Sequence, residues 1–365
     1  MEKTKVGLLY GGKSPEHNIS LLSAQNVFKN IDTNKYEVVL LPIDKSGNWH
    51  WQEGREMQLS NPTDAAMISL PHYDDEVYLD HNPGKGNIIS KKTGKIIAKI
   101  DLLYPILHGT YGEDGSIQGM AKMANLPCVG CSTLGSAIGM DKDVTKRLLK
   151  NSGINVADFI TLRKGYNDHI SYEEVSVKLG KELFIKPANL GSSVGISYVT
   201  DKKSFDKAVK MGFEYDPKVV IEEKIEGREI ECAVIGNQNP KASVIGELGK
   251  TEWYSFEKKY INTDGISLII PADIAQELSN KARKLALDTY INLECCGLTR
   301  VDIFLQKDGK MIVNEVNTSP GFTNNSMYPK LWEHSGLPYK ELVSELIKLA
   351  IERNNFELGL KTTHN

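Results

Sequence analysis

The stretch RVDIFLQKDGKMIVNEVNTSPGFT, residues 300–323, places charged and amide side chains on two strands that are otherwise apolar. Side chains alternate between the two faces of a strand, so Arg300 and Asp302 share one face of the first predicted strand. Glu315 and Asn317 share one face of the second, and the Asp-Gly dipeptide between the strands predicts a turn. We therefore expect these four side chains to meet on one patch of a hairpin.

Charged groups in such a hairpin would cost several kcal/mol each if they were buried without partners. Carboxylate and amide oxygens suit a hard divalent cation, and Mg²⁺ commonly binds one or two carboxylates together with substrate phosphates. The hairpin therefore predicts a Mg²⁺–nucleotide site. The alternative is an exposed strand pair with an Arg–Asp ion pair, which would contribute little stability.

The composition is that of an ordinary soluble protein, with 365 residues, 40% hydrophobic and 25% charged, which is long enough for two or three domains. The 44 Lys and Arg against 47 Asp and Glu give a net charge of -3, so no global basic field would recruit nucleic acid. The N-terminus lacks the features of a signal peptide, and no run approaches the roughly 18 apolar residues of a membrane span. The five cysteines do not form a disulfide framework, and we expect a cytoplasmic protein in which Cys128 and Cys131 are buried thiols rather than zinc ligands.

Strand and helix signals alternate in the first third of the chain, which predicts an α/β fold with a parallel sheet and covering helices. Residues 51–97 are polar and weakly periodic, and we interpret them as an excursion from that sheet. A new unit is predicted to begin near residue 130. Helices are predicted over 141–150, along an apolar stripe at 274–286, and over 340–353.

The segment GLLYGGKS, residues 7–14, matches the Walker A pattern in letters but not in context. A P-loop needs its first glycine after the strand and its Lys-Ser at the start of a helix, whereas here the first glycine lies within the predicted strand. What remains is a strand-to-loop turn with Ser14, Glu16 and His17 at its exit, where ligands bind in open α/β sheets.

Four other segments carry possible ligand-binding groups. The loop 189–195 is rich in small residues that can approach phosphate oxygens, and Lys186 precedes it in a predicted strand; a plain hairpin turn is the alternative. The segment 108–115 joins a histidine to three glycines at the end of a buried strand, and a helix cap by Asp114 explains only part of it. The segment 221–230 offers acceptors for adenine and ribose, or is a solvated charged face. The segment 252–260 is either a mobile flap or a strand with a basic edge.

Taken in order, these motifs resemble those of the D-alanine–D-alanine ligase family of the ATP-grasp superfamily. The resemblance spans nearly the whole chain and rests on eight segments: GGKSPEHNIS, HGTYGEDGSIQG, MDK, FIKPANLGSSVG, EGREIECAVIG, FEKKY, GLTRVDIF and NEVNTSPGFTNNSMYP. It implies that ATP phosphorylates the carboxylate of one D-alanine and that the amine of a second D-alanine then attacks the acyl phosphate. The product would be the dipeptide used in peptidoglycan precursor synthesis.

The resemblance also implies an ATP-grasp fold with a Rossmann-like substrate domain (1–130), a central ATP-grasp subdomain (131–220) and a C-terminal catalytic domain (221–365). A homodimer is implied as well. Glu16 would bind the ammonium group of the first D-alanine and would itself be hydrogen-bonded through Ser192 to Tyr260. Three further groups would surround the tetrahedral oxyanion, namely Arg300, the backbone N–H of Gly321, and His108.

Nucleotide, metal and second-substrate residues follow from the same motifs. The implied ATP-binding residues contact phosphates, adenine or ribose, and are Lys142, Lys186, Ser193, Glu222, Glu223, Ile225, Glu229, Lys259 and Asn314. Two Mg²⁺ ions, for which Mn²⁺ is expected to substitute, would bind Asp302, Glu315 and Asn317. The carboxylate of the second D-alanine would lie against Ser326 and Met327.

Relatives that make D-alanyl-D-lactate tend to lose the Lys-Tyr end of the flap, and those that make D-alanyl-D-serine often carry Arg at the position of Met327. This chain has Lys259, Tyr260 and Met327, which favours D-alanine over D-serine and makes D-lactate the weakest alternative. Another ATP-grasp carboxylate–amine ligase and a non-catalytic nucleotide-binding regulator are the other hypotheses. The presence of Arg300 beside the metal ligands argues against the regulator, because a protein that only binds nucleotide has little need of an oxyanion partner.

Overall fold

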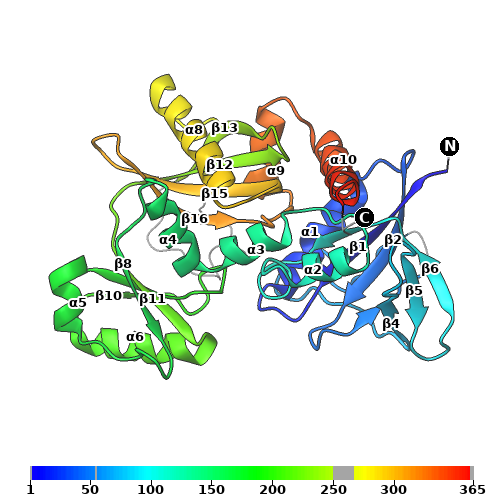
Figure 1. The fold of residues 1–365 in the computed structure, drawn as a ribbon, viewed down its shortest axis with the longest axis horizontal. Coiled ribbons are helices and arrows are strands. Elements are labelled where there is room, and N and C mark those ends of the chain that lie inside the picture. The colour runs from blue at the N-terminus through cyan, green and yellow to red at the C-terminus, as the bar shows by residue number, and fades with distance from the viewer. Residues whose placement is uncertain (1, 54–55, 250–266, 362–365) are drawn as a thin grey trace.

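The computed structural model describes residues 2–53, 56–249 and 267–361, which form a mixed α/β fold with three sheets (Figure 1). The first sheet has the strand order β6-β5-β4-β3-β2-β1-β7. Its elements and the two helices of this region are β1 (Thr4–Gly11), α1 (His17–Asn30), β2 (Tyr36–Ile43), β3 (Trp49–His50), β4 (Glu76–Leu79), β5 (Asn87–Ser90), β6 (Ile96–Lys99), β7 (Leu102–Ile106) and α2 (Ser116–Met123).

Two expectations for this sheet need correction. Strands β2, β1 and β7 are parallel, but β3 to β6 are antiparallel additions to the same sheet. Residues 51–97 are therefore not an excursion from the sheet but supply three of its strands. Short strands such as β4 and β5 bury alternate side chains only, and their periodicity is too brief to recognise in the sequence. The rejection of the Walker A interpretation is confirmed, because Gly7 and Gly11 both lie within β1.

The second sheet has the order β10-β9-β11-β8 and its described pairings are antiparallel. Two helices lead into it and two more pack on it. The elements are α3 (Thr133–Met140), α4 (Lys142–Asn151), β8 (Phe159–Arg163), α5 (Tyr172–Leu179), β9 (Leu183–Pro187), β10 (Ser197–Val199), α6 (Lys202–Tyr215) and β11 (Lys218–Glu223). The predicted start of the helix at 141–150 is confirmed, since the Asp141 side chain accepts a hydrogen bond from the N–H of Val144 (3.1 Å) as an N-cap.

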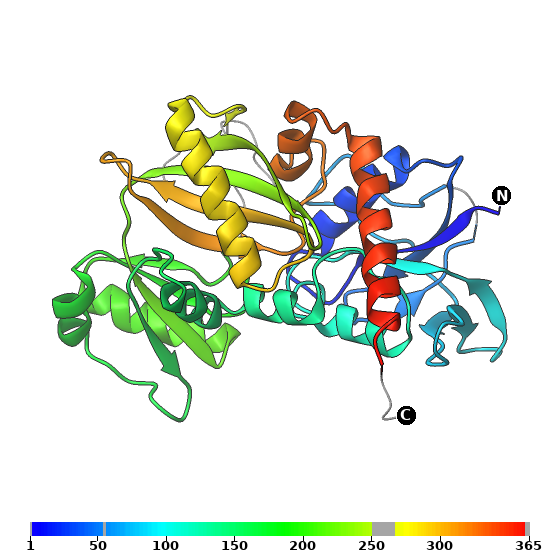
Figure 2. The same ribbon diagram turned by 45° about the horizontal axis from the view of Figure 1, so that its top comes forward.

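The third sheet has the order β14-β13-β12-β15-β16 and contains the predicted hairpin. Its elements are β12 (Arg228–Gly236), β13 (Lys241–Leu248), β14 (Leu268–Ile269), α8 (Gln276–Asn292), β15 (Gly297–Leu305), β16 (Met311–Asn317), α9 (Met327–His334) and α10 (Tyr339–Leu358). One face of β12, with Cys232 and Val234, packs in a core with α8. The other face, with Ala233 and Ile235, packs with α9 and α10, and α8 is seen crossing the sheet in Figure 2.

One hydrophobic core joins the first sheet to the end of the chain. It contains Leu8 and Tyr104 of the first sheet, Tyr328 of α9, and Leu342 and Leu346 of α10. The C-terminal helix therefore packs against the N-terminal part of the fold. The domain boundaries near 130 and 220 stay a prediction; the chain passes from the second sheet to the third after β11. Within the described ranges, no helix combines the length and apolar character of a membrane span.

Candidate active site

A β-bulge in the hairpin brings the four expected side chains to one face. The register is regular from the turn up to the pair Ile303–Val313, but Asp302 then pairs with Glu315. Asn314 is the extra residue, as in a β-bulge. Without it, Asp302 would face Asn314, and Glu315 would point to the opposite, apolar face. The bulge thus confirms the predicted convergence and adds Asn314 to the lining of the same cavity.

The guanidinium of Arg300 lies among buried carboxylates on this face. Its Nε and Nη2 atoms each donate to one oxygen of Asp302, both at 2.7 Å, and Nε lies 2.9 Å from Oε2 of Glu231 on β12. The Nδ2 of Asn317 donates to Oδ2 of Asp302 at 3.0 Å. Glu231 and Asp302 are directly opposite each other on neighbouring strands, where like charges repel. Arg300 offsets that repulsion, and we call this group the acid-rich cluster: Glu231, Arg300, Asp302, Glu315 and Asn317.

The donor set fits a divalent cation, as the hairpin predicted. Carboxylates of Asp302 and Glu315 and the amide of Asn317 come from one face of two paired strands. Carboxylate oxygens of Glu229, Glu231 and Asp302 also lie within 4.8 Å of one another. Hard oxygen ligands of this kind are those that Mg²⁺ and Mn²⁺ take in proteins.

A second buried group has the opposite balance of charge. The Glu222 carboxylate of β11 lies 2.8 Å from Nζ of Lys186 on β9 and 3.3 Å from Nζ of Lys146 on α4. We call these three residues the lysine-rich cluster. Burial alone would raise the pKa of Glu222, but the two lysines lower it to about 2.

The two lysines respond differently to their burial. Burial lowers the pKa of Lys146, and the shared charge of Glu222 offsets this only in part. For Lys186 the charge of Glu222 and its direct hydrogen bond outweigh burial, so its pKa is raised. We regard Lys186 as the firmly charged partner because it has the shorter contact. A cluster with more cationic than anionic groups suits phosphate oxygens.

The glycine loop after β9 lies against Glu16, the residue predicted to bind the first substrate. The hydroxyl of Ser192 donates to Oε1 of Glu16, which is buried at the start of α1. Ser192 and Ser193 have positive φ angles of 51° and 61°. A Cβ on Gly191 would lie 3.2 Å from Oε2 of Glu16, so the loop approaches that carboxylate closely.

Lys142 faces the same loop from the start of α4. Its Nζ donates to the carbonyl of Leu190 (2.6 Å), and both residues line the cavity that also contains Glu315 and Lys146. Lys142, a predicted phosphate-binding residue, and Glu315, a predicted metal ligand, therefore share one cavity with the glycine loop.

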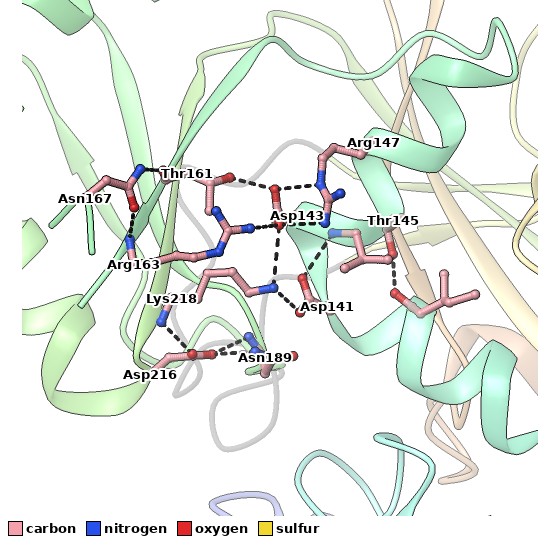
Figure 3. Close-up of polar contacts among 12 residues, drawn as sticks. Asp141, Asp143, Thr145, Arg147, Thr161, Arg163, Asn167, Asn189, Asp216 and Lys218 are labelled. Atoms are coloured by element: carbon pink, nitrogen blue, oxygen red, sulfur yellow. Dashed lines mark hydrogen bonds and ion pairs between the residues drawn. The ribbon is translucent and has the colours of Figure 1, made fainter. Parts of the chain in front are cut away.

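A network of polar contacts fixes the start of α4 against the second sheet (Figure 3). The buried carboxylate of Asp143 accepts hydrogen bonds from Arg147, Arg163 and Thr161, at 2.9 to 3.2 Å. Lys218 of β11 pairs with Asp141, and the Asp216 carboxylate accepts from the backbone N–H of Asn189 (2.7 Å). The network positions both Lys142 and the first residue of the glycine loop.

His108 and Glu113 join the HGTYGEDG segment to the stretch that follows β16. The Nδ1 of His108 is 2.9 Å from the carbonyl oxygen of Ser319, and Oε1 of Glu113 accepts from the N–H of Ser319 (2.9 Å). The other oxygen of Glu113 accepts from the N–H of Gly109 (2.8 Å). Burial and the nearby charge of Glu16 raise the pKa of Glu113 to about 8, while burial lowers that of His108.

The remaining predicted residues are placed less directly at the cavity. The Ser326 hydroxyl accepts from the N–H of Thr323 (2.9 Å) and lies 2.8 Å from where a Cβ of Gly321 would be. Met327 begins α9 with a buried side chain that faces Gly246, so in this structure it is a core residue.

Glu223 and Ile225, two predicted nucleotide-binding residues, lie within the described part of the chain, whereas the predicted flap does not. Glu223 accepts a hydrogen bond from the backbone N–H of Asp158 (2.8 Å), and Ile225 is half-buried after β11. Lys259 and Tyr260, with the whole 252–260 segment, lie outside the described residues.

Sequence reasoning missed three buried residues of this region. Lys146 is four residues after Lys142 and so on the same face of a predicted helix. Glu231 is two residues after Glu229 and so on the same face of a predicted strand. Glu113 was within a recognised motif but had no role assigned to it. The periodicity could have identified the first two, whereas their partners come from other strands and helices.

The comparisons with known proteins agree with this geometry. A family model described as "D-ala D-ala ligase N-terminus" matches residues 5–131, and one described as "D-ala D-ala ligase C-terminus" matches residues 148–348. The chain is 50% identical over 366 residues to the D-alanine–D-alanine ligase A of Escherichia coli K12, covering 100% of both proteins. This chain belongs to the D-alanine–D-alanine ligase family. The predicted family and the ATP-grasp type of fold are thereby confirmed.

Solved structures of the family cover nearly the whole chain. The VanG D-Ala:D-Ser ligase of Enterococcus faecalis has a TM-score of 0.82 and 34% identity, over 96% of this chain and 100% of that one. A D-alanine–D-alanine ligase of Bacillus anthracis complexed with ATP has a TM-score of 0.71 and 28% identity, over 97% and 99%. Members of the family with either second substrate therefore share this fold.

Proposed function

We propose that this ligase joins two D-alanine molecules to D-alanyl-D-alanine for peptidoglycan precursor synthesis. The phosphoryl group of ATP passes to the carboxylate of the first D-alanine, which gives an acyl phosphate and ADP. The amine of the second D-alanine then attacks the acyl carbon, loses a proton, and displaces phosphate. The proposal is supported by the 50% identity to a D-alanine–D-alanine ligase over the full length.

The observation that carries the proposal is that the predicted amino-acid site lies beside the predicted nucleotide site. Glu16 is bonded to Ser192 of the glycine loop, and Gly191 of that loop lines the cavity with Lys142 and Glu315. A D-alanine whose ammonium group is bound at Glu16 would have its α-carboxylate directed toward that cavity. A carboxylate is a poor electrophile, and phosphorylation beside a preorganised cation is the chemistry that such a site can supply.

Each group then has a defined task. Glu16 binds and orients the ammonium group, and Lys142 and Lys186 neutralise ATP phosphates. Arg300, with the N–H of Gly321 and nearby His108, stabilises the negative oxygen that develops on the reacting carbon. Bound at Asp302, Glu315 and Asn317, two Mg²⁺ ions, or Mn²⁺ in their place, would supply charge neutralisation for the phosphates. We propose further that Glu222 and Glu229 bind adenine and ribose, with Ser193, Glu223, Ile225, Lys259 and Asn314 completing the nucleotide site.

The choice of second substrate is part of the proposal. A fold shared with a D-Ala:D-Ser ligase cannot distinguish D-alanine from D-serine. Met327 stands where D-serine ligases frequently carry Arg, which favours D-alanine. Because Met327 is the first residue of α9, its packing positions the preceding residue, Ser326. We also propose a cytoplasmic homodimer, for which sedimentation of the purified protein is the test.

Measurement of ADP release tests the function directly. D-alanine, D-serine, D-lactate and L-alanine are supplied singly and in pairs with ATP and Mg²⁺, and products are identified by mass spectrometry. D-alanine alone is expected to release ADP and give D-alanyl-D-alanine, with smaller yields of mixed products. Absence of turnover with D-alanine at every pH tried would overturn the proposal.

A further inference from the structure

Glu231 is a buried carboxylate in the acid-rich cluster with no role in the reaction described above. Its side chain is 3% exposed, and its Oε2 lies 2.9 Å from Nε of Arg300. On β12 it is directly opposite Asp302 of β15, on the same face as Glu229. Its partners in the structure are thus the oxyanion-binding arginine and, across the strand pair, a proposed metal ligand.

The contacts of Asp302 create a conflict between two of its tasks. Both of its oxygens accept hydrogen bonds from Arg300, and Oδ2 also accepts from Asn317. These three hydrogen bonds occupy three of the roughly four acceptor sites of the carboxylate, so a cation that binds Asp302 competes with Arg300 for it. Arg300, for its part, has to point N–H groups at the negative oxygen that develops on the reacting carbon instead of at Asp302. A buried guanidinium needs a counter-ion, because a buried charge without compensation is strongly destabilising.

Glu231 resolves this conflict because it is a second, permanent counter-ion for Arg300. It approaches the guanidinium at Nε, which leaves the terminal nitrogen Nη2 available once Asp302 turns to a cation. Its backbone is fixed by pairing with β13 on one side and β15 on the other. A carboxylate on a central strand can therefore hold the side chain of Arg300 in one orientation.

We infer that Glu231 is a positioning residue that keeps Arg300 aimed at the negative oxygen of the reacting centre while Asp302 binds a divalent cation; this inference rests on the proposed function. Glu231 acts through Arg300 and does not touch the substrate. A different role, as a further metal ligand, is the competing explanation, because its oxygen is within 4.8 Å of those of Glu229 and Asp302. The guanidinium that lies between these carboxylates favours the positioning role.

The test uses a phosphinate analogue of D-alanyl-D-alanine, in which a tetrahedral phosphinate replaces the reacting carbon. Binding is measured by calorimetry with ADP and Mg²⁺ present. Glu231→Gln is expected to lower the affinity for the analogue and kcat together, by about 10- to 100-fold, with little change in the KM for ATP. Glu231→Asp, which keeps the charge, is expected to recover part of the loss.

A double-mutant cycle with Arg300→Gln separates positioning from a general loss of structure. If Glu231 acts through Arg300, Glu231→Gln causes little further loss of analogue binding once Arg300 has been replaced. The matched control is Glu247→Gln on β13, which removes a carboxylate that is paired with Arg228 in the same sheet (2.6 and 2.7 Å). The control is expected to change the melting temperature but not the affinity for the analogue.

Mn²⁺ binding, followed by electron paramagnetic resonance with ADP and no D-alanine, distinguishes the competing explanation. Glu231→Gln is expected to weaken Mn²⁺ binding far less than Asp302→Asn does. An equal loss in the two variants would make Glu231 a metal ligand and overturn the inference. Unchanged analogue binding in Glu231→Gln would overturn it too, whereas failure of the unaltered protein to bind the analogue would instead contradict the proposed function.

Discussion

The two buried ionic clusters differ in the sign of the charge that is in excess. The acid-rich cluster has one guanidinium, Arg300, for the carboxylates of Glu231 and Asp302. The lysine-rich cluster has two ammonium groups for the single carboxylate of Glu222. The first is suited to receive cations and the second to receive phosphate anions, and both line or adjoin the same cavity. The difference explains how one cavity could bind both parts of a metal–nucleotide complex.

The largest effect is expected from Arg300→Gln, because it removes the guanidinium that pairs with both Asp302 and Glu231. The free energy of unfolding should fall by about 3–5 kcal/mol, the usual result of removing one partner of a buried ion pair. Loss of the oxyanion partner should also lower kcat on the order of 10²- to 10³-fold. Urea unfolding and steady-state kinetics measure the two effects. A variant as stable as the unaltered protein would show that Arg300 does not balance these carboxylates.

Glu113 extends the comparison between the two clusters. Its buried carboxyl accepts hydrogen bonds from backbone N–H groups, whereas the buried carboxylate of Glu222 forms ion pairs with lysines. Its pKa is raised to about 8 in the folded state, from 4.5 ordinarily. Between these pH values the folded state keeps a proton that the unfolded state has lost, so stability from this group falls as pH rises from 4.5 to 8.

In Glu113→Gln that decline should be absent. Since one pKa unit corresponds to about 1.4 kcal/mol, the unaltered protein should lose a few kcal/mol more than the variant between pH 5 and 8.5. Urea unfolding at both pH values measures this. Parallel losses in the two proteins would contradict the raised pKa.

A smaller effect on stability is expected from Lys186→Met, because Glu222 keeps Lys146 as a partner. We expect a loss of about 1.5–3 kcal/mol, typical of a hydrogen bond to a charged group. The KM for ATP should rise on the order of tenfold, with the KM for D-alanine little changed. Lys146→Met is the matched variant in the same cluster. A loss in Lys186→Met as large as that in Arg300→Gln would remove the distinction between the clusters.

The smallest effect is expected from Asp141→Ala, because Asp141 is not a member of the lysine-rich cluster and is connected to it through the start of α4 and its pair with Lys218 of β11. Loss of the N-cap bond to Val144 should cost about 1 kcal/mol of stability. Because Lys142 follows directly, the KM for ATP should also rise slightly. Thermal unfolding and ATP titration measure both, with Ser171→Ala at the N-cap of α5 as the control for capping alone. An equal rise of KM in that control would contradict a local effect at Lys142.

Much of the local structure follows from sequence alone. Asp141 as a cap, the Asp-Gly turn of the hairpin and the apolar period of the last helix all depend on residues within a few positions of one another. The motifs were likewise sufficient to recognise the family and the lysine and acid types that its chemistry needs. These features are determined by short-range sterics, capping and side-chain periodicity, which depend on residues close together in the sequence.

Other features were decided only by the tertiary structure. The bulge at Asn314 has no glycine or proline signal, yet it alone turns Glu315 and Asn317 to the face of Arg300. The strands within 51–97 are too short to be recognised from sequence periodicity, and they become evident only from their pairing in the first sheet.

Long-range pairing likewise determines the charge balance of the site. Glu231 and Asp302 are 71 positions apart in the sequence, but they lie opposite each other because β12 pairs with β15. The sequence therefore determined which groups this protein has for its chemistry. The pairing of strands distant in sequence determined which groups neutralise one another, because burial makes a charge depend on the partners that the fold brings to it.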